Sequence, residues 1–445
     1  MVDIHEVFST SITLDEVERA NRCAEGACPE GESDTNAVRI VHAGSILPLK
    51  HEHDRDSFIP FSPILCAFYA GPKSGQADRG FGDSCVYVMR VELDGSHSLV
   101  NKLDCPQLNQ KANCTPVLFY LNQGEARRLR HSLDLGAHET VTPHAPVVTG
   151  EFKTSIQDIV DKANHPDDDK TIALIYKAAP KDADSVSYVS LSFDEGRAFT
   201  TPRVLVEHAP NSGRGPVRTK PFLMRKGPYA GRILLPCSVE SKDGLVFADF
   251  SDDDLRTIAQ SNAVTPDESQ KVAAAKSFAA HGVVLSALFE DLGVHRKGSA
   301  ANDPITPEDD AKAAKVHMML SASASQLFVA DSADGGATFG KPYPIDLYNC
   351  NMGIDVISYQ NRLLCLGKLV TDPDKCDFTR GAPLSLFMSH DGKSFTKIFT
   401  LEEDPQGVFT SPCLQVDRRH HLLYVSYTDH RKAMKLRIFR LMLNH

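Results

Sequence analysis

The sequence predicts an all-β fold, and two observations carry this prediction. Most of the chain consists of short runs rich in β-branched and aromatic residues, such as TIALIYKAAP, VSYVSLSF and HLLYVSYTD, separated by Gly, Pro, Asp and Asn. These runs recur at short intervals over residues 37–250 and 317–443, and no helical segment alternates regularly with them. This spacing favours a β-propeller or a β-sandwich over an α/β fold.

Composition is typical of a globular protein and excludes several partners. A propeller can hold 445 residues in one ring, and 42% hydrophobic with 24% charged residues argues against disorder. The net charge of −10, without a long basic stretch, argues against nucleic acid or an anionic membrane as partner. The N-terminus MVDIHEVFSTSITLDE does not resemble a signal peptide, and no apolar run is long enough to span a membrane. We therefore expect a soluble, cytoplasmic protein.

The cysteines and histidines do not predict a metal or disulfide framework. Eleven cysteines, an odd number, are scattered through the chain, which favours reduced core thiols. Cys23 and Cys28 form a lone C-x4-C, and the pair His420-His421 has no neighbouring ligand at metal-binding spacing. No glycine-rich loop is suited to a phosphate. We expect no metal and no cofactor.

Two regions interrupt the strand pattern. Thr13-Leu14-Asp15-Glu16 has the spacing of a capping box and predicts a short helix, so we assign residues 1–36 to an N-terminal appendage and 37–445 to the main domain. Residues 252–316 are rich in Ala, Lys, Asp and Glu, with helix starts at Thr265-Pro266 and Thr306-Pro307. We expect a partly helical insertion there.

A short motif occurs three times. Residues 332–339 (SADGGATF) fit S-x-D-x-G-x-T-[WF] in full, residues 192–199 (SFDEGRAF) lack only the Thr, and residues 389–395 (SHDGKSF) are one residue shorter. Ser251-Asp252-Asp253 is a candidate for a decayed fourth copy. The Ser and Asp can bond the turn backbone, Gly can adopt positive φ, and the aromatic ring can fill the gap between strands. The motif therefore predicts hairpins rather than active sites.

These motifs resemble the Asp boxes of the sialidase (neuraminidase) superfamily, and the resemblance covers roughly residues 38–435. AGSILPL, CAFYAG and SCVYVMR resemble the first blade of its BNR-repeat-like branch, and GPVRTKP resembles the stretch G-P-V-x-x-K-P. LLPCSVE, NMGIDVISYQNRLL, RGAPL and SYTDHRK follow in the family's order. The resemblance implies a six-bladed β-propeller with its ligand site at the central axis.

Sialidases combine three arginines that clamp the sugar carboxylate, an aspartic acid, and a tyrosine nucleophile assisted by a glutamate. The resemblance places the acid at Asp83, with Asp78 as its competitor, and the assisting carboxylate at Glu240. A turn-capping Asp and a solvated Glu at a strand end are the alternative interpretations. Arg380, in RGAPL, matches one clamp arginine.

The other two clamp positions depart from the sialidase pattern. The first aligns with His42, three residues from Arg39, and a histidine binds anions only when protonated. The second aligns with Ser321, so that part of the clamp is missing.

Further substrate-binding candidates lie near the expected axis. Arg214, Arg218 and Lys220 form a basic cluster that either contacts an acidic sugar or solvates a loop. Asp355, in NMGIDVISYQNRLL, completes the predicted substrate-binding set with His42, Arg218, Lys220 and Arg380.

The nucleophile position also departs from the pattern, because it aligns with Ser411, which has no visible base in the sequence. Tyr427, with Arg431 nearby, is the aromatic hydroxyl that could replace the nucleophile. The alternative interpretation of Tyr427 is a core tyrosine.

The sequence leaves more than one function open. The first is a sialidase-like exo-glycosidase that acts on an acidic, sialic-acid-like glycan through Asp83, Glu240 and Tyr427. The alternative is a catalytically degenerate propeller that binds glycan or protein through the same axial site. A hydrolase or lyase for a less anionic sugar is a third possibility. In each glycan hypothesis the partner is a glycan or a small sugar, and the oligomeric state is not predicted.

Overall fold

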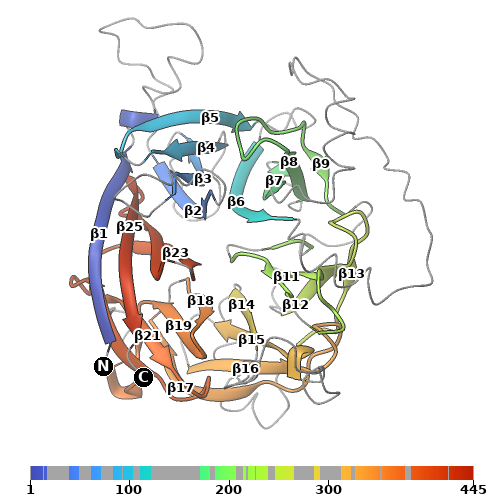
Figure 1. Cartoon of the computed structure of the whole chain (residues 1–445), viewed down its shortest axis with the longest axis vertical. Helices are drawn as coiled ribbons and strands as arrows, with labels where there is room; N and C mark the ends of the chain where they lie inside the picture. The colour runs from blue at the N-terminus through green and yellow to red at the C-terminus, as the bar shows by residue number, and fades with distance from the viewer. Residues whose placement is uncertain are drawn as a thin grey trace, which may run out of the picture.

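Six antiparallel β-sheets surround a central axis in the computed structural model of the chain (Figure 1). This arrangement confirms the predicted six-bladed, all-β propeller. The residues that the structure describes are 2–13, 15–17, 40–49, 62–71, 84–92, 94–103, 111–121, 171–180, 186–206, 214–216, 219–225, 227–238, 246–264, 285–290, 312–321, 326–350, 353–375, 382–418 and 420–443.

The first three blades each contain four consecutive strands, numbered outward from the axis. Blade 1 contains β2 (Ile40–Pro48), β3 (Ile64–Gly71), β4 (Cys85–Val91) and β5 (His97–Leu103). Blade 2 contains β6 (Lys111–Tyr120), β7 (Ile172–Pro180), β8 (Val186–Ser192) and β9 (Arg203–Val204). Blade 3 contains β10 (Phe222–Leu223), β11 (Ile233–Ser238), β12 (Val246–Ser251) and β13 (Ala259–Gln260).

The last three blades vary this plan. Blade 4 contains β14 (Leu285–Glu290), β15 (Val316–Ser321), β16 (Gln326–Ser332), β17 (Tyr343–Asn349) and a fifth strand, β20 (Leu369–Val370). Blade 5 contains β18 (Asp355–Tyr359), β19 (Arg362–Gly367), β21 (Leu384–Ser389) and β22 (Thr396–Glu402), with the short helix η1 (Pro373–Lys375) before β21. Blade 6 contains β23 (Phe409–Asp417), β24 (Leu422–Asp429), β25 (Ala433–Leu443) and β1 (Val2–Thr13).

Blade 6 is built from both ends of the chain. β1 pairs with β25 from Val2 to Thr13, with a register shift between Glu6 and Phe8, and it forms the outer edge of the blade (Figure 1). Residues 2–13, part of the predicted appendage, therefore belong to the propeller. The strand was not assigned to a blade because its partner lies at the opposite end of the sequence.

Polar contacts tie β1 to the neighbouring blades. Arg437 of β25 bonds the Glu6 carboxylate and donates to the Leu401 carbonyl of β22 at 2.7 Å. The predicted capping box is present, because the Thr13 N–H donates to the Glu16 carboxylate at 2.6 Å. Glu16 also contacts Nδ1 of His97 in β5 at 3.0 Å. The N-terminal segment thus joins blades 5, 6 and 1.

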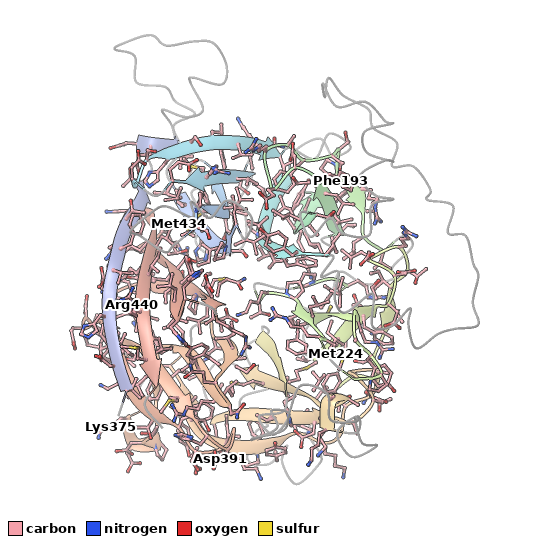
Figure 2. The ribbon with its side chains drawn as sticks, viewed as in Figure 1. Phe193, Met224, Lys375, Asp391, Met434 and Arg440 are labelled. Carbon is pink, nitrogen blue, oxygen red and sulfur yellow. The ribbon has the colours of Figure 1, made fainter. Side chains whose placement is uncertain are left out.

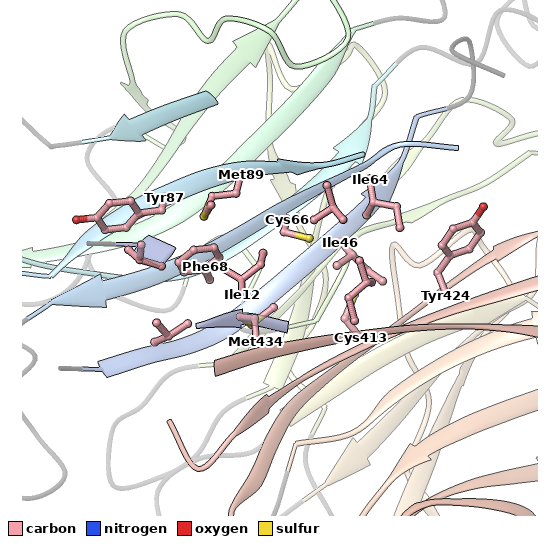
Figure 3. Close-up of a cluster of buried hydrophobic side chains, with 14 of the residues drawn as sticks. Ile12, Ile46, Ile64, Cys66, Phe68, Tyr87, Met89, Cys413, Tyr424 and Met434 are labelled. Carbon is pink, nitrogen blue, oxygen red and sulfur yellow. The ribbon is translucent and has the colours of Figure 1, made fainter. Parts of the chain in front are cut away.

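A separate hydrophobic cluster fills each of the six spaces between neighbouring blades (Figure 2). Ile12 of β1 lies in the cluster between blades 6 and 1, with Cys66, Phe68, Cys413 and Met434 (Figure 3). Because both faces of the central strands pack on a neighbouring blade, their sequences are continuously apolar rather than alternating.

Four Asp boxes form the turns between the third and fourth strands of blades 2 to 5. In each, the Ser hydroxyl donates to the Asp carboxylate and accepts the backbone N–H of the residue at the glycine position. The candidate fourth copy is confirmed, because Ser251 and Asp253 make these bonds although Leu255 occupies the glycine position with φ 67°. The motifs build hairpins, as predicted.

The described part of the predicted insertion 252–316 belongs to the propeller. Residues 252–264 include the fourth Asp box and β13, and β14 is the innermost strand of blade 4. The insertion was placed too early because Leu255 obscures the motif. The helix starts predicted at Thr265 and Thr306 lie outside the described residues.

Two further expectations can be compared with the described residues. Six cysteines of the described residues are free thiols: Cys66, Cys85, Cys237, Cys350, Cys365 and Cys413. Within the same part of the chain, no helix has the length and apolar character needed to cross a membrane.

If β1 is integral to the fold, Ile12→Ala should lower the free energy of unfolding by about 2–5 kcal/mol, because Ile12 is fully buried in an interblade cluster. Val7→Ala, on the same strand but 43% exposed, should change it by less than about 0.5 kcal/mol. Urea denaturation of both variants measures this, and equal effects would contradict a structural role for β1.

The Asp boxes predict a pH dependence of stability. Hydrogen bonds, above all from the Ser394 backbone N–H, lower the pKa of Asp391 to about 2, below the value of about 3.9 in an unfolded chain. The ionised carboxylate therefore stabilises the fold above about pH 4, and this contribution is lost as pH falls toward 2. Asp391→Asn should be less stable than the wild type at pH 7, and the difference should shrink between pH 4 and 2. Urea denaturation across this range tests it; a constant difference would contradict it.

Candidate functional site

The two faces of the ring carry different connections. Strand direction alternates within a blade, so the turns between the third and fourth strands, which hold the Asp boxes, lie at one face. The connections between second and third strands, and the starts of the innermost strands, lie at the opposite face. We call this opposite face the site face, because the residues predicted to bind substrate cluster in these connections.

Four of the predicted site residues lie outside the described residues: Asp83, Glu240, Arg380 and Arg218. Asp78 and Arg39 lie outside them as well. Asp83, Glu240, Arg380 and Arg218 each neighbour, in the sequence, a described strand that begins or ends at the site face. His42, Lys220, Asp355 and Tyr427 are described.

Lys220 and Asp355 form a buried ion pair that joins distant blades. Lys220, just before β10 in blade 3, donates through Nζ to the Asp355 carboxylate at the start of β18 in blade 5, and to the Val356 carbonyl at 3.2 Å. Asp355 also accepts the Leu414 N–H of blade 6 at 2.6 Å. Burial raises the pKa of Asp355, and the Lys220 ammonium opposes this shift. One carboxylate thus connects blades 3, 5 and 6.

Arg214 is paired in the same way. Its Nε donates to Asp249 at 2.7 Å, and the Gly215 N–H donates to the other carboxylate oxygen at 2.8 Å. Burial raises the pKa of Asp249, against the influence of Arg214. The described members of the predicted basic cluster, Arg214 and Lys220, are therefore each bonded to a buried aspartate.

His42, at the position of the first clamp arginine, lies among hydroxyl groups. Its Nδ1 is 3.2 Å from the Thr410 hydroxyl and 3.3 Å from the Thr428 hydroxyl, both in blade 6. Its ring packs edge-on against Tyr69, with centroids 5.4 Å apart. The side chain is buried at the contact between blades 6 and 1.

Tyr427 faces blade 5 rather than His42. Its ring is 0% exposed and its hydroxyl donates to Glu402, which also accepts from Lys435 at 2.8 Å. Burial, followed by the neighbouring Glu402, raises the pKa of Tyr427 above its usual value. Adjacent residues of a strand face opposite sides, so Thr428, and not Tyr427, lies beside His42.

Sequence reasoning missed three bulges on innermost strands. The register shifts between His42 and Ser45 in β2, between Cys114 and Val117 in β6, and between Thr410 and Cys413 in β23. In β6 and β23 the extra residues are Thr115-Pro116 and Ser411-Pro412, and both Thr115 and Ser411 have positive φ, 50° and 51°. A proline inside a strand pattern was the available signal, because it marks a bulge or an edge.

The described residues contain no group of three or more His, Cys, Asp or Glu arranged to hold a metal ion.

Comparison with known proteins places this geometry in a family. Residues 145–425, more than half of the chain, match the model of the BNR repeat-like domain. The chain belongs to the BNR repeat-like family. None of the curated proteins compared matches this BNR repeat-like chain.

Solved structures similar to the BNR repeat-like propeller include sialidases. A protein of unknown function from Dyadobacter fermentans is 13% identical, with 99% of both chains covered and a TM-score of 0.54. A Hadza microbial sialidase is 10% identical over 90% of this chain and 65% of its own, with a TM-score of 0.54. A leech intramolecular trans-sialidase is 13% identical over 94% and 71%, with a TM-score of 0.50. At these identities the likeness shows the sialidase-like propeller fold.

Asp355→Asn should lower the free energy of unfolding by about 3–5 kcal/mol, because it leaves the Lys220 ammonium without its anionic partner among blades 3, 5 and 6. Asp372→Asn breaks an ion pair with Lys375 whose side chains are 43% and 75% exposed, and should cost less than about 0.5 kcal/mol. Denaturant titration of both variants gives the comparison. A small effect of Asp355→Asn would show that the carboxylate does not hold these blades together.

Proposed function

We propose that this propeller binds glycan at its site face and lacks the tyrosine nucleophile of sialidases. The shared fold and family support a glycan as ligand, and the leech trans-sialidase was solved with a sialic acid derivative, 2,7-anhydro-Neu5Ac. The observation that carries the proposal is the placement of Tyr427, which is fully buried and bonded to Glu402 between blades 5 and 6.

A covalent nucleophile must reach the anomeric carbon of the sugar and needs a base to accept its proton. The Tyr427 hydroxyl is bonded to Glu402 of blade 5 and points away from His42. The raised pKa of Tyr427 also disfavours the phenolate. Ser411 takes the aligned nucleophile position, and no described acidic or basic side chain is hydrogen-bonded to its hydroxyl. These features favour binding over hydrolysis.

The exo-glycosidase hypothesis assigns Asp83 as acid, Glu240 as assisting carboxylate and Arg380 as carboxylate clamp. Substrate binding by Arg218, Lys220, His42 and Asp355 belongs to the same hypothesis. It predicts turnover of an α-sialoside, which the binding proposal does not.

The test combines a glycan array with an assay of fluorogenic glycosides headed by an α-sialoside. We expect glycan binding without turnover, and no change in either result for Tyr427→Phe, which keeps the buried ring. Turnover that is lost in Asp83→Ala and in Tyr427→Phe, with both variants folded by circular dichroism, would contradict the proposal and establish the exo-glycosidase. Absence of binding to every glycan would overturn it as well.

A further inference from the structure

The three bulged strands lie on consecutive blades. Blade 1 stands between blades 6 and 2, and β2 contacts both β23 and β6. His42 bonds Thr410 of β23, and the Ser45 hydroxyl accepts the Leu118 N–H of β6 at 3.1 Å. The bulges therefore form one continuous part of the inner wall, which we call the bulge sector: His42, Ser45, Thr115, Thr410 and Ser411.

Thr115 combines two unfavourable features. Its φ of 50° is rare for a β-branched residue. Its side chain is 6% exposed, and its hydroxyl oxygen is buried without a hydrogen-bond partner among the described residues. A strained backbone and an unsatisfied buried hydroxyl both cost stability, and such costs cluster at ligand-binding positions.

The other side of the sector repeats these features. Ser411 has φ 51° and is 7% exposed. Ser426 of β24 pairs with Cys413 beside this bulge, and its hydroxyl is fully buried, again without a partner in the described part of the chain. Bulged inner strands in blades 6 and 2 thus hold hydroxyl groups on both sides of His42.

The polar side chains of the sector carry hydroxyls and one imidazole and no permanent charge. The described cations of the sequence-predicted basic cluster, Lys220 and Arg214, are already bonded to buried aspartates. Hydroxyl groups both donate and accept hydrogen bonds, as sugar hydroxyls do, and they do not offer the charge-assisted pair that a carboxylate prefers.

We propose that the bulge sector is a subsite for a neutral sugar residue, with the Thr115 and Ser411 hydroxyls bonded to hydroxyl groups of the ligand. This inference rests on the proposed glycan-binding function and names the ligand class. The affinity is accordingly insensitive to salt, since no ion pair with the ligand forms at this subsite.

The test measures binding of the full chain to an array of neutral oligosaccharides and their sialylated counterparts, for the wild type and for Thr115→Val. Valine keeps the shape and the β-branching but removes the hydroxyl. We expect the neutral members to bind at least as well as the sialylated ones, and Thr115→Val to weaken binding by roughly three- to tenfold. The melting temperature should stay the same or rise, because the buried hydroxyl has no partner to lose.

Ser238→Ala is the matched control, because Ser238 is also buried with a partnerless hydroxyl but lies on blade 3. It should leave affinity unchanged. If Thr115→Val binds as tightly as the wild type, or if Ser238→Ala loses as much affinity as Thr115→Val, the subsite is overturned. Glycan binding at the site face would stand in either case. A salt-sensitive preference for sialylated members would overturn the subsite in the same way. Failure of the wild type to bind any glycan would overturn the proposed function together with the subsite.

Discussion

Pairing between the two ends of the chain is the constraint on which the rest of the structure depends. β1 covers the edge of β25, and Ile12 fills the cluster between blades 6 and 1. Closure brings β23 of blade 6 beside β2 of blade 1, which places Thr410 and Thr428 around His42. The bulge sector exists only in a closed ring, because its parts come from the first and last blades. The proposed subsite therefore makes ligand binding depend on closure of the ring.

The two faces of the ring differ in electrostatics as well as in connections. At the Asp-box face, hydrogen bonds lower the pKa of Asp391, and the largest contribution comes from the Ser394 N–H. At Asp253 and Asp334, burial acts to raise the pKa, but hydrogen bonds outweigh it and the pKa of each is lowered. At the site face, burial raises the pKa of Asp355 despite its cationic partner, and burial does the same for Asp249 within β12. In the Asp boxes, hydrogen bonds stabilise the ionised aspartates of the turns. For Asp355 and Asp249, Lys220, Arg214 and backbone N–H groups offset the cost of removing a carboxylate from water.

Local signals in the sequence predicted the architecture well. Alternation of apolar strands with turns predicted an all-β fold, and three Asp boxes indicated repeated blades. The fourth box was only a candidate because Leu255 replaces glycine, and this led to the misplaced insertion. β1 was separated from the propeller because its partner, β25, lies at the other end of the chain. Local patterns cannot supply such a pairing.

The site was harder to predict than the fold. Lys220 and Asp355 are 135 residues apart in the sequence. Nothing in the sequence around either residue identifies the other as its partner. The direction of Tyr427 depends on which side of β24 faces blade 5, which a strand pattern leaves open. The bulges were signalled by Pro116 and Pro412, but positive φ at the preceding residue is unusual before proline and could not be inferred.

The measurement that tests the central claim most directly is a crystal structure of the chain with a neutral oligosaccharide selected on the array. A sugar residue in the bulge sector, with its hydroxyl groups within hydrogen-bonding distance of Thr115 and Ser411, is the predicted result. A sugar bound at the Asp-box face, or at the site face through arginines with the bulge sector unoccupied, would contradict it.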